Sequence, residues 1–183
     1  ASEGKLRAGC WGSEERGRGP REDVSDVLQA ESLEELLEIC RCREGGWSAE
    51  RTAQSFHRLK QLKQQQRRWS GGDFESLREL VQVLEEKALQ VMGGLNARQI
   101  GLVLNACAAA PVMRPREALL KELELRALDM MRSSRDVSNY MWACAKIGMG
   151  PSPFLYWELC IQADVVMHDF NGQDLSNFMW ACA

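Results

Sequence analysis

The chain has 183 residues, of which 45% are hydrophobic and 27% are charged, and its net charge is −3. This length suits one ordinary domain or a short repeat array. The charge disfavours a strongly basic nucleic-acid-binding domain, and no stretch approaches the roughly 18 apolar residues that a membrane helix needs. Seven scattered cysteines do not indicate a disulfide framework. We therefore expect a soluble protein of a reducing compartment.

The first 21 residues are rich in Gly, Arg, Glu and Ser and lack apolar periodicity. They bury too little apolar surface to offset the entropy of ordering, so we predict a disordered N-terminal segment at 1–21. The sequence begins at Ala1 and ends at Ala183 inside a predicted helix, and we expect a processed or partial chain. The remainder, 22–183, is predicted to be a helical array.

A sequence repeat dominates the C-terminal half. Residues 136–145 read DVSNYMWACA and residues 174–183 read DLSNFMWACA, so the two segments differ at two positions and lie 38 residues apart. Residues 99–108, QIGLVLNACA, form a third copy at an offset of 37, and a weaker fourth copy starts at Ser48. A fixed period of this length is typical of repeat architectures.

Each copy opens with a signal for the start of a helix, a capping residue four positions before the first apolar residue. The predicted N-caps are Ser48, Asn96, Ser133 and Asn171. Three positions later stand Gln99, Asp136 and Asp174, with Arg51 in the first copy. In three copies the pair resembles a capping box, in which the third side chain bonds back to the N-cap backbone.

A second helix is predicted before each of these, over 23–42, 73–92, 115–132 and 152–168. Asp73 and Ser152 are plausible caps, and Pro115 and Pro153, again 38 apart, suit a first helical turn. Helical spacing predicts that each of these helices has an apolar core side. The expected core residues are Leu33, Leu36 and Leu37; Leu77, Leu80 and Leu84; Leu119, Leu123 and Ala127; and Trp157, Ile161 and Val165.

The predicted fold is therefore all-α, an α-solenoid of about four helix-turn-helix repeats of ~38 residues. The repeats span about 23–63, 73–110, 115–148 and 152–183, and a basic, Gln-rich insertion occupies 64–72.

The pattern D-[VL]-S-N-x-M-W-A-C-A, followed by K-I-G and a Pro-led helix, resembles the octotricopeptide repeat and the repeats of proteins that carry a RAP domain. The resemblance covers roughly 30–183. It implies a protein of chloroplasts or mitochondria that binds single-stranded organellar RNA and acts in its stability, processing, translation or in ribosome assembly. The RAP domain, which is proposed to resemble a nuclease, would follow Ala183, so no nuclease residue is assigned here.

Helical geometry selects the residues available to RNA. With Val137, Tyr140, Met141, Cys144 and Ile147 as the core side of one copy, the opposite side carries polar and aromatic residues. The candidates for phosphate or base contacts are Arg98, Asn105, Arg135, Asn139, Lys146, Gln173 and Asn177. For Asn139 and Asn177, bonds to loops or neighbouring helices are an equal alternative. For Trp142 and Trp180, spacing between repeats is favoured over base stacking. For Arg98 and Arg135, which lie in a first helical turn, a solvated charge is favoured over a ligand contact.

A basic segment without acidic residues runs from Arg51 to Gly72. Its cations are Arg51, Arg58, Lys60, Lys63, Arg67 and Arg68. These side chains are candidates for gripping a phosphate backbone. The alternative is a solvated, flexible insertion, which is slightly favoured.

No catalytic constellation, phosphate-binding loop or metal-ligand cluster is recognisable, and Cys40 and Cys42 form a lone C-x-C without a second ligand pair. We therefore expect a non-enzymatic protein without cofactor. RNA binding along the array is the leading interpretation. The alternative is a protein–protein interaction scaffold or a structural subunit of a large organellar assembly.

Overall fold

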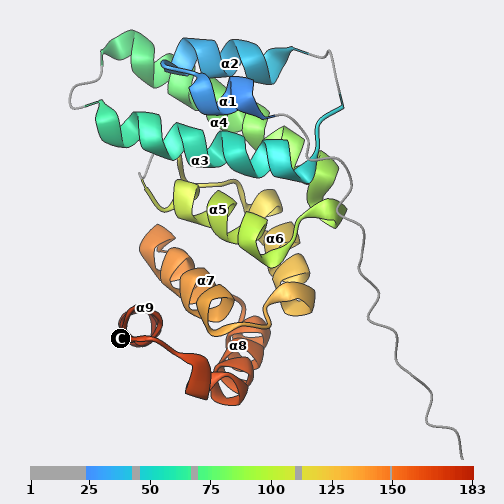
Figure 1. Ribbon diagram of the computed structural model, residues 1–183, viewed down its shortest axis with the longest axis vertical. Coiled ribbons are helices and arrows are strands. Elements are labelled where there is room, and N and C mark those ends of the chain that lie inside the picture. Colours follow the sequence, from blue (N-terminus) through green and yellow to red (C-terminus); the bar gives the residue numbers. More distant parts are fainter. Residues whose placement is uncertain (1–23, 43–45, 67–69, 110–112, 149) are drawn as a thin grey trace, which may run out of the picture.

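The structure is a computed structural model that describes residues 24–42, 46–66, 70–109, 113–148 and 150–183 (Figure 1). The predicted all-α class is confirmed, because helices make up 81% of these residues and none of them lies in a strand. No helix in the described ranges is long and apolar enough to cross a membrane. The N-terminal segment 1–21, predicted to be disordered, lies outside the described residues.

The helices follow one another through short connections. Their bounds are α1 Ser25–Gln29, α2 Leu33–Arg41, α3 Ala49–Gln65, α4 Gly71–Val91, α5 Ala97–Cys107, α6 Glu117–Met130, α7 Ser134–Ile147, α8 Pro153–Val165 and α9 Gly172–Cys182, with short 3₁₀ turns η1 Met92–Gly94 and η3 Met167–Asp169.

The helices form two rows. In row B, α3 contacts α5, α5 contacts α7 and α7 contacts α9; in row A, α2 contacts α4, α4 contacts α6 and α6 contacts α8. Helices of one row also touch the other row, as α3 touches α4 and α7 touches α8. Figure 1 shows α3, α5 and α7 lying one below the other, with α1 and α2 at the far end from α8 and α9.

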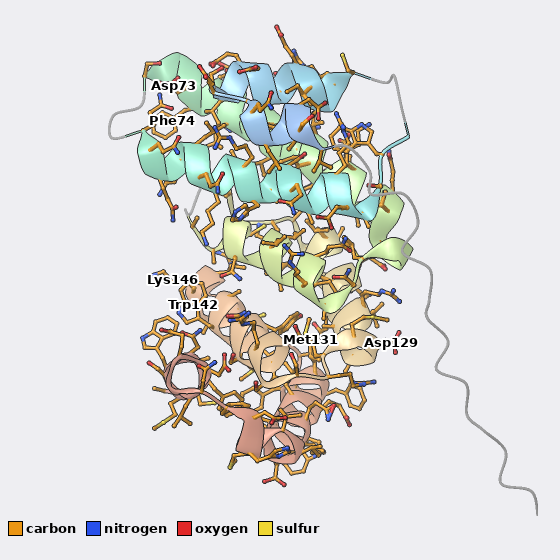
Figure 2. All side chains as sticks on the ribbon, in the orientation of Figure 1. Asp73, Phe74, Asp129, Met131, Trp142 and Lys146 are labelled. Carbon is orange, nitrogen blue, oxygen red and sulfur yellow. The ribbon has the colours of Figure 1, made fainter. Side chains whose placement is uncertain are left out.

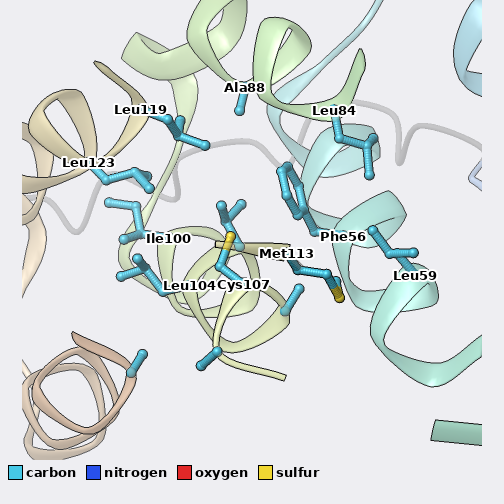
Figure 3. Packing of buried hydrophobic residues seen from close by; sticks show 14 of the residues in the cluster. Phe56, Leu59, Leu84, Ala88, Ile100, Leu104, Cys107, Met113, Leu119 and Leu123 are labelled. Carbon is cyan, nitrogen blue, oxygen red and sulfur yellow. The ribbon is translucent and has the colours of Figure 1, made fainter. Parts of the chain in front are cut away.

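The core runs continuously between the two rows. Phe56 and Leu59 of α3, Leu84 of α4 and Ile100 of α5 are almost wholly buried side chains of one cluster, seen from close by in Figure 3. Each such side chain contributes about 1.5–3 kcal/mol through its removal from water. Because no helix covers its own apolar side, this burial exists only where two or three helices meet.

Cysteines belong to this core, as their apolar sequence context indicates. Cys40, Cys107 and Cys144 are buried and free. Burial raises the pKa of Cys40 and of Cys144 to about 12, so both stay as uncharged thiols. Cys42 is exposed, so the two cysteines of the C-x-C sequence point to different environments.

The four predicted N-caps of row B are confirmed. The side chains of Ser48, Asn96, Ser133 and Asn171 each accept a hydrogen bond from the backbone N–H three residues later. Complete capping boxes form in α5 and α9. In α7 the carboxylate of Asp136 instead accepts from the hydroxyl of Ser133, at 2.7 Å. Each cap contributes about 1 kcal/mol to helix stability.

The first predicted helix, 23–42, is wrong in one respect, because it is split into α1 and α2. Ser32 is an N-cap that accepts from Glu35 N, and the Glu35 carboxylate accepts from Glu31 N at 2.7 Å. The carbonyl of Ala30 is bonded by Arg58 Nε at 2.8 Å instead of continuing the helix. The Ser-x-x-Glu spacing of a helix start was present in the sequence but was not recognised.

Two further boundaries differ from the prediction. The cap of α4 is Ser70, whose hydroxyl accepts from Asp73 N, so Asp73 is the third residue of the box and not the cap. Pro115 lies before the N-cap Arg116 and outside α6. That start is fixed by the buried carboxylate of Glu85, which accepts a hydrogen bond from Arg116 N at 2.7 Å.

The expected core of the last row A helix is also wrong. Trp157, Ile161 and Val165 are exposed, and Leu155, Leu159 and Ala163 are buried instead. Aligning Pro115 with Pro153 imposed an offset of 38, but Pro153 is the first residue of α8 whereas Pro115 precedes α6. The buried residues of α6 and α8 are in fact 36 positions apart, which rotates α8 by about 200° relative to the prediction.

A buried carboxylate joins α7 to α9. Asp174 is 4% exposed. It accepts hydrogen bonds from the hydroxyls of Ser134 and Ser138 at 3.3 and 3.2 Å, and from Asn171 N at 3.4 Å. One side chain therefore closes the capping box of its own helix and holds the neighbouring helix.

Replacing Asp174 with Ala should lower the free energy of unfolding by about 1–2 kcal/mol, because the cap of α9 and the link to α7 are lost while Ser134 and Ser138 keep the carbonyls of Asp169 and Arg135 as acceptors. Urea unfolding followed by circular dichroism measures this change. The matched control is Asp136→Ala, which removes the equivalent but less buried carboxylate of α7 and should cost about 0.5–1 kcal/mol. Equal losses would contradict a special role for Asp174.

Candidate nucleic-acid interface

Charge is divided between the two rows. Helices α3, α5, α7 and α9 of row B carry seven Lys or Arg and three acidic residues, a net charge of +4. Helices α2, α4, α6 and α8 of row A carry five Lys or Arg and fourteen acidic residues, a net charge of −9. The modest net charge of the whole chain therefore conceals one basic and one acidic row, and only row B suits a polyanion.

The open side of row B is the polar stripe that helical geometry predicts. Its positions are Glu50, Gln54, His57 and Gln61 on α3; Arg98, Leu102 and Asn105 on α5; Arg135, Asn139, Trp142 and Lys146 on α7; and Gln173, Asn177 and Trp180 on α9. None of these residues is buried, whereas Val137, Tyr140, Met141 and Cys144 on the other side of α7 are. Ile147, predicted for the core side, is half-buried. Equivalent residues of successive helices thus share one face.

Cations gather at the α3–α5 end of the stripe. The half-buried His57 has a lowered pKa, first because burial disfavours its charged form and then because Lys60, Arg98 and Arg58 are positive nearby. Arg98 is exposed at the start of α5. A phosphate placed here would be attracted by Lys60 and Arg98, and it would favour protonation of His57.

Glu50 is an acidic residue of the stripe and is held by amide groups. Its carboxylate accepts from Gln54 Nε2 and from Gln99 Nε2, both at 2.7 Å. These hydrogen bonds lower its pKa, the bond from Gln54 being the larger cause. The bond from Gln99 links α3 to α5, just as Asp174 links α9 to α7.

Aromatic rings lie at the α7–α9 end of the stripe. The Trp142 and Trp180 ring centroids are 6.4 Å apart with planes tilted by 42°, and Lys146 Nζ lies 6.0 Å from the Trp180 centroid. Trp142 packs partly against the core, while Trp180 is 52% exposed. Figure 2 shows Trp142 and Lys146 projecting from α7 on the side where α9 lies. The two rings space α7 from α9, and Trp180 leaves one aromatic surface open.

Several candidate cations are engaged in the fold. Arg51 forms an ion pair with Asp26 and lies over the Trp47 ring, Arg58 bonds the Ala30 carbonyl, and Lys63 Nζ bonds the Ala109 carbonyl at 3.0 Å. Helix α3 includes Lys63 and continues to Gln65. The predicted insertion at 64–72 therefore begins later, after Gln65. Arg67 and Arg68 lie outside the described residues.

The amides of the stripe differ in their hydrogen bonds. Asn105 Nδ2 donates to the Gly101 carbonyl of its own helix at 2.8 Å. On α9, Gln173 Nε2 donates to Asn177 Oδ1 at 2.8 Å. Asn139 is half-buried on α7, between the exposed Arg135 and the half-buried Trp142. Amide groups that form such hydrogen bonds within their own helix still present donors and acceptors to a ligand.

The polar stripe offers cations, amide groups and the exposed ring of Trp180, which suit ligand binding more than catalysis. Within the described ranges, no three His, Cys, Asp or Glu residues come together in a way that could hold a metal ion. The segregation of charge was not recognised from the sequence, although the net charge of each predicted helix would have revealed it. His57, left out of the candidate set, has Lys60 three residues later on the same side of α3.

Comparison with known proteins does not place the chain in a family. Its sequence matches no family model, and no curated protein shows significant similarity to it.

Replacing Lys60 with Met should raise the pKa of His57 towards its usual value of 6.5, because one of the nearby positive charges is removed. Proton NMR titration of the imidazole signals measures the pKa, and His57→Gln identifies the signal, since the chain has two histidines. Lys121→Met, on row A, is the control and should leave the His57 titration in place. An unchanged pKa in Lys60→Met would show that Lys60 does not face His57.

Proposed function

We propose that this chain is a non-catalytic RNA-binding protein whose helix pairs form an α-solenoid similar to the octotricopeptide repeat. In this proposal it acts in a chloroplast or mitochondrion, where it holds single-stranded RNA along row B. Its effect on RNA stability, processing, translation or ribosome assembly follows from occupancy of the RNA and not from chemistry of its own. The resemblance of the repeated sequence is the argument for the organelle and for the class of RNA.

The observation that carries the proposal is the separation of charge between the rows. A polyanion gains most where exposed cations outnumber acidic residues, since each phosphate contact releases counterions. Arg98, Arg135 and Lys146 are exposed on one face of row B. Row A repels the same ligand, so the RNA is directed to one side of the molecule.

The residues of the stripe suit an extended single strand. Arginine and lysine bind phosphate, the amides of Asn139 and Asn177 read base edges, and Trp180 stacks on a base. Leu102 interrupts the polar positions on α5 and provides an apolar contact there. If each helix pair meets one base, about four nucleotides are covered.

The double variant Arg98→Gln and Arg135→Gln should weaken binding to single-stranded RNA at every sequence. The slope of log affinity against log salt should become shallower by about 1.4, because about 0.7 is lost for each phosphate contact with a single strand. Fluorescence anisotropy of a labelled organellar RNA pool at several salt concentrations measures both quantities.

The matched control is Arg78→Gln with Lys121→Gln, which removes two exposed cations from row A. This variant changes the net charge equally and should keep both the affinity and the salt slope. An equal loss of RNA affinity in the two double variants would mean that binding depends only on the net charge of the protein. An absence of RNA binding at low salt would disprove the proposal.

RNA affinity should rise as the pH falls from about 8 to about 6. In the free protein the pKa of His57 is lowered, so the imidazole is neutral at neutral pH. A bound phosphate favours the protonated form, so binding takes up a proton and is tighter at lower pH. His57→Gln should flatten this dependence, which anisotropy titrations at each pH would show. A pH response that survives His57→Gln would remove His57 from the interface.

A second function, as a protein–protein scaffold or a structural subunit of a large organellar assembly, is favoured by a different observation. Residues 147–183 contain four acidic residues and no Lys or Arg. The helices of this segment, α8 and α9, expose several large apolar side chains. This end of the molecule suits a protein partner better than RNA.

A further inference from the structure

The outer side of α8 carries an uninterrupted apolar stripe. Phe154, Trp157, Ile161 and Val165 are 64%, 66%, 46% and 59% exposed. Their spacing of three, four and four residues places them along one side of the helix. The opposite side, with Leu155, Leu159 and Ala163, is buried against the rest of the molecule. Helix α8 is therefore apolar on its solvent side as well as on its core side.

Packing between neighbouring helix pairs does not account for this stripe. At the offset of 36 that relates the buried residues of α6 and α8, the equivalents on α6 are Ala118, Lys121, Leu125 and Asp129. Helix α6 has row A neighbours on both sides, α4 and α8, yet these four residues remain exposed. The corresponding positions of α8 would thus stay open even beside a further helix pair, so their large apolar side chains need another explanation.

The edges of the stripe on α8 itself are acidic. Glu158 and Asp164 flank it on the two sides of α8, and α8 has no Lys or Arg. One cation of the preceding segment lies nearby, because Arg132 Nη1 donates to Gln162 Oε1 at 3.5 Å and Arg132 borders the same pocket as Glu158 and Ile161. Antiparallel packing of α8 on the α8 of a second copy would place the same edge of both helices together and bring Glu158 close to Glu158 of the other chain, which is unfavourable. The complementary surface is therefore apolar along its centre and basic at its edges.

We propose that the outer side of α8 is a docking face for an amphipathic helix of a partner protein, with an apolar stripe flanked by Lys and Arg. The apolar side chains would pack into Phe154, Trp157, Ile161 and Val165, as helices do in recognition grooves. Trp157 is the expected centre of binding energy, since exposed tryptophans are frequent hot spots. The inference rests on the second proposed function and is independent of RNA binding by row B.

The test uses a fluorescein-labelled amphipathic helix of leucine and lysine, about 14 residues long, as the probe for the full chain. Its control is a peptide of the same composition in which leucine no longer lies on one side. Trp157→Ser should weaken binding at least about tenfold. Phe74→Ser, which removes a 49% exposed aromatic residue of α4 at the other end of the molecule, should leave binding unchanged (Figure 2).

A double variant, Glu158→Gln with Asp164→Asn, tests the charges separately. It should lower the affinity several-fold and make it less dependent on salt, because only the ionic edges are lost. Circular dichroism of every variant shows whether the helices are intact. Anisotropy with RNA in the same samples should be unaffected by Trp157→Ser, so failure of this face is distinguishable from failure of the RNA interface.

Three results would overturn the proposal. Equal binding of the two peptides, or equal binding to wild type and Trp157→Ser, would show that the probe does not recognise the stripe. Binding that does not depend on salt and is unchanged in the variant Glu158→Gln with Asp164→Asn would exclude a basic partner. A wild-type dimer in sedimentation velocity that Trp157→Ser dissociates would assign the stripe to a second copy of the chain.

Discussion

The structure depends on one constraint, that each helix has more apolar surface than any single neighbour covers. Val137 and Met141 of α7 are buried, at 0% and 2% exposed, in a helix whose main contact is α9. Their equivalents on α9, Leu175 and Met179, are 47% and 62% exposed, because no described helix follows. Identical or similar residues thus contribute to stability only where a next helix is present.

This constraint also determines where charge is placed. Helices α5 and α7 each contact row A on one side and their row B neighbours on two sides, which leaves one side for polar residues. Arg98, Arg135 and Lys146 therefore lie on the open side of α5 and α7, and the acidic residues of row A lie on the other layer. Segregation of charge between layers allows a chain of pI about 5.6 to present a basic face. The proposed RNA interface follows from this division and does not need a basic protein.

Links between neighbouring helices reuse the residues that begin each helix. Gln99 closes the capping box of α5 and bonds Glu50 of α3, and Asp174 closes the box of α9 and bonds two serines of α7. A cap that also reaches the previous helix fixes the position of one helix along the other, which apolar contacts alone do not do. The exposed side of α8 lies outside this system, and for that reason its apolar stripe points to a partner.

The sequence by itself determined the helices of row B and their starting points. Capping residues and helical spacing act within a few residues, so Ser48, Asn96, Ser133 and Asn171 could be identified as N-caps, and the core side of α7 was correctly assigned apart from the half-buried Ile147. Only the tertiary structure decided the rotation of α8, because large apolar residues lie on two opposite sides of that helix and its sequence gives no preferred side. The tertiary structure also decided which cations are available to a ligand. Arg51 pairs with Asp26 and Arg58 bonds the carbonyl of Ala30, and these partners lie 25 and 28 positions away, which no local pattern reveals.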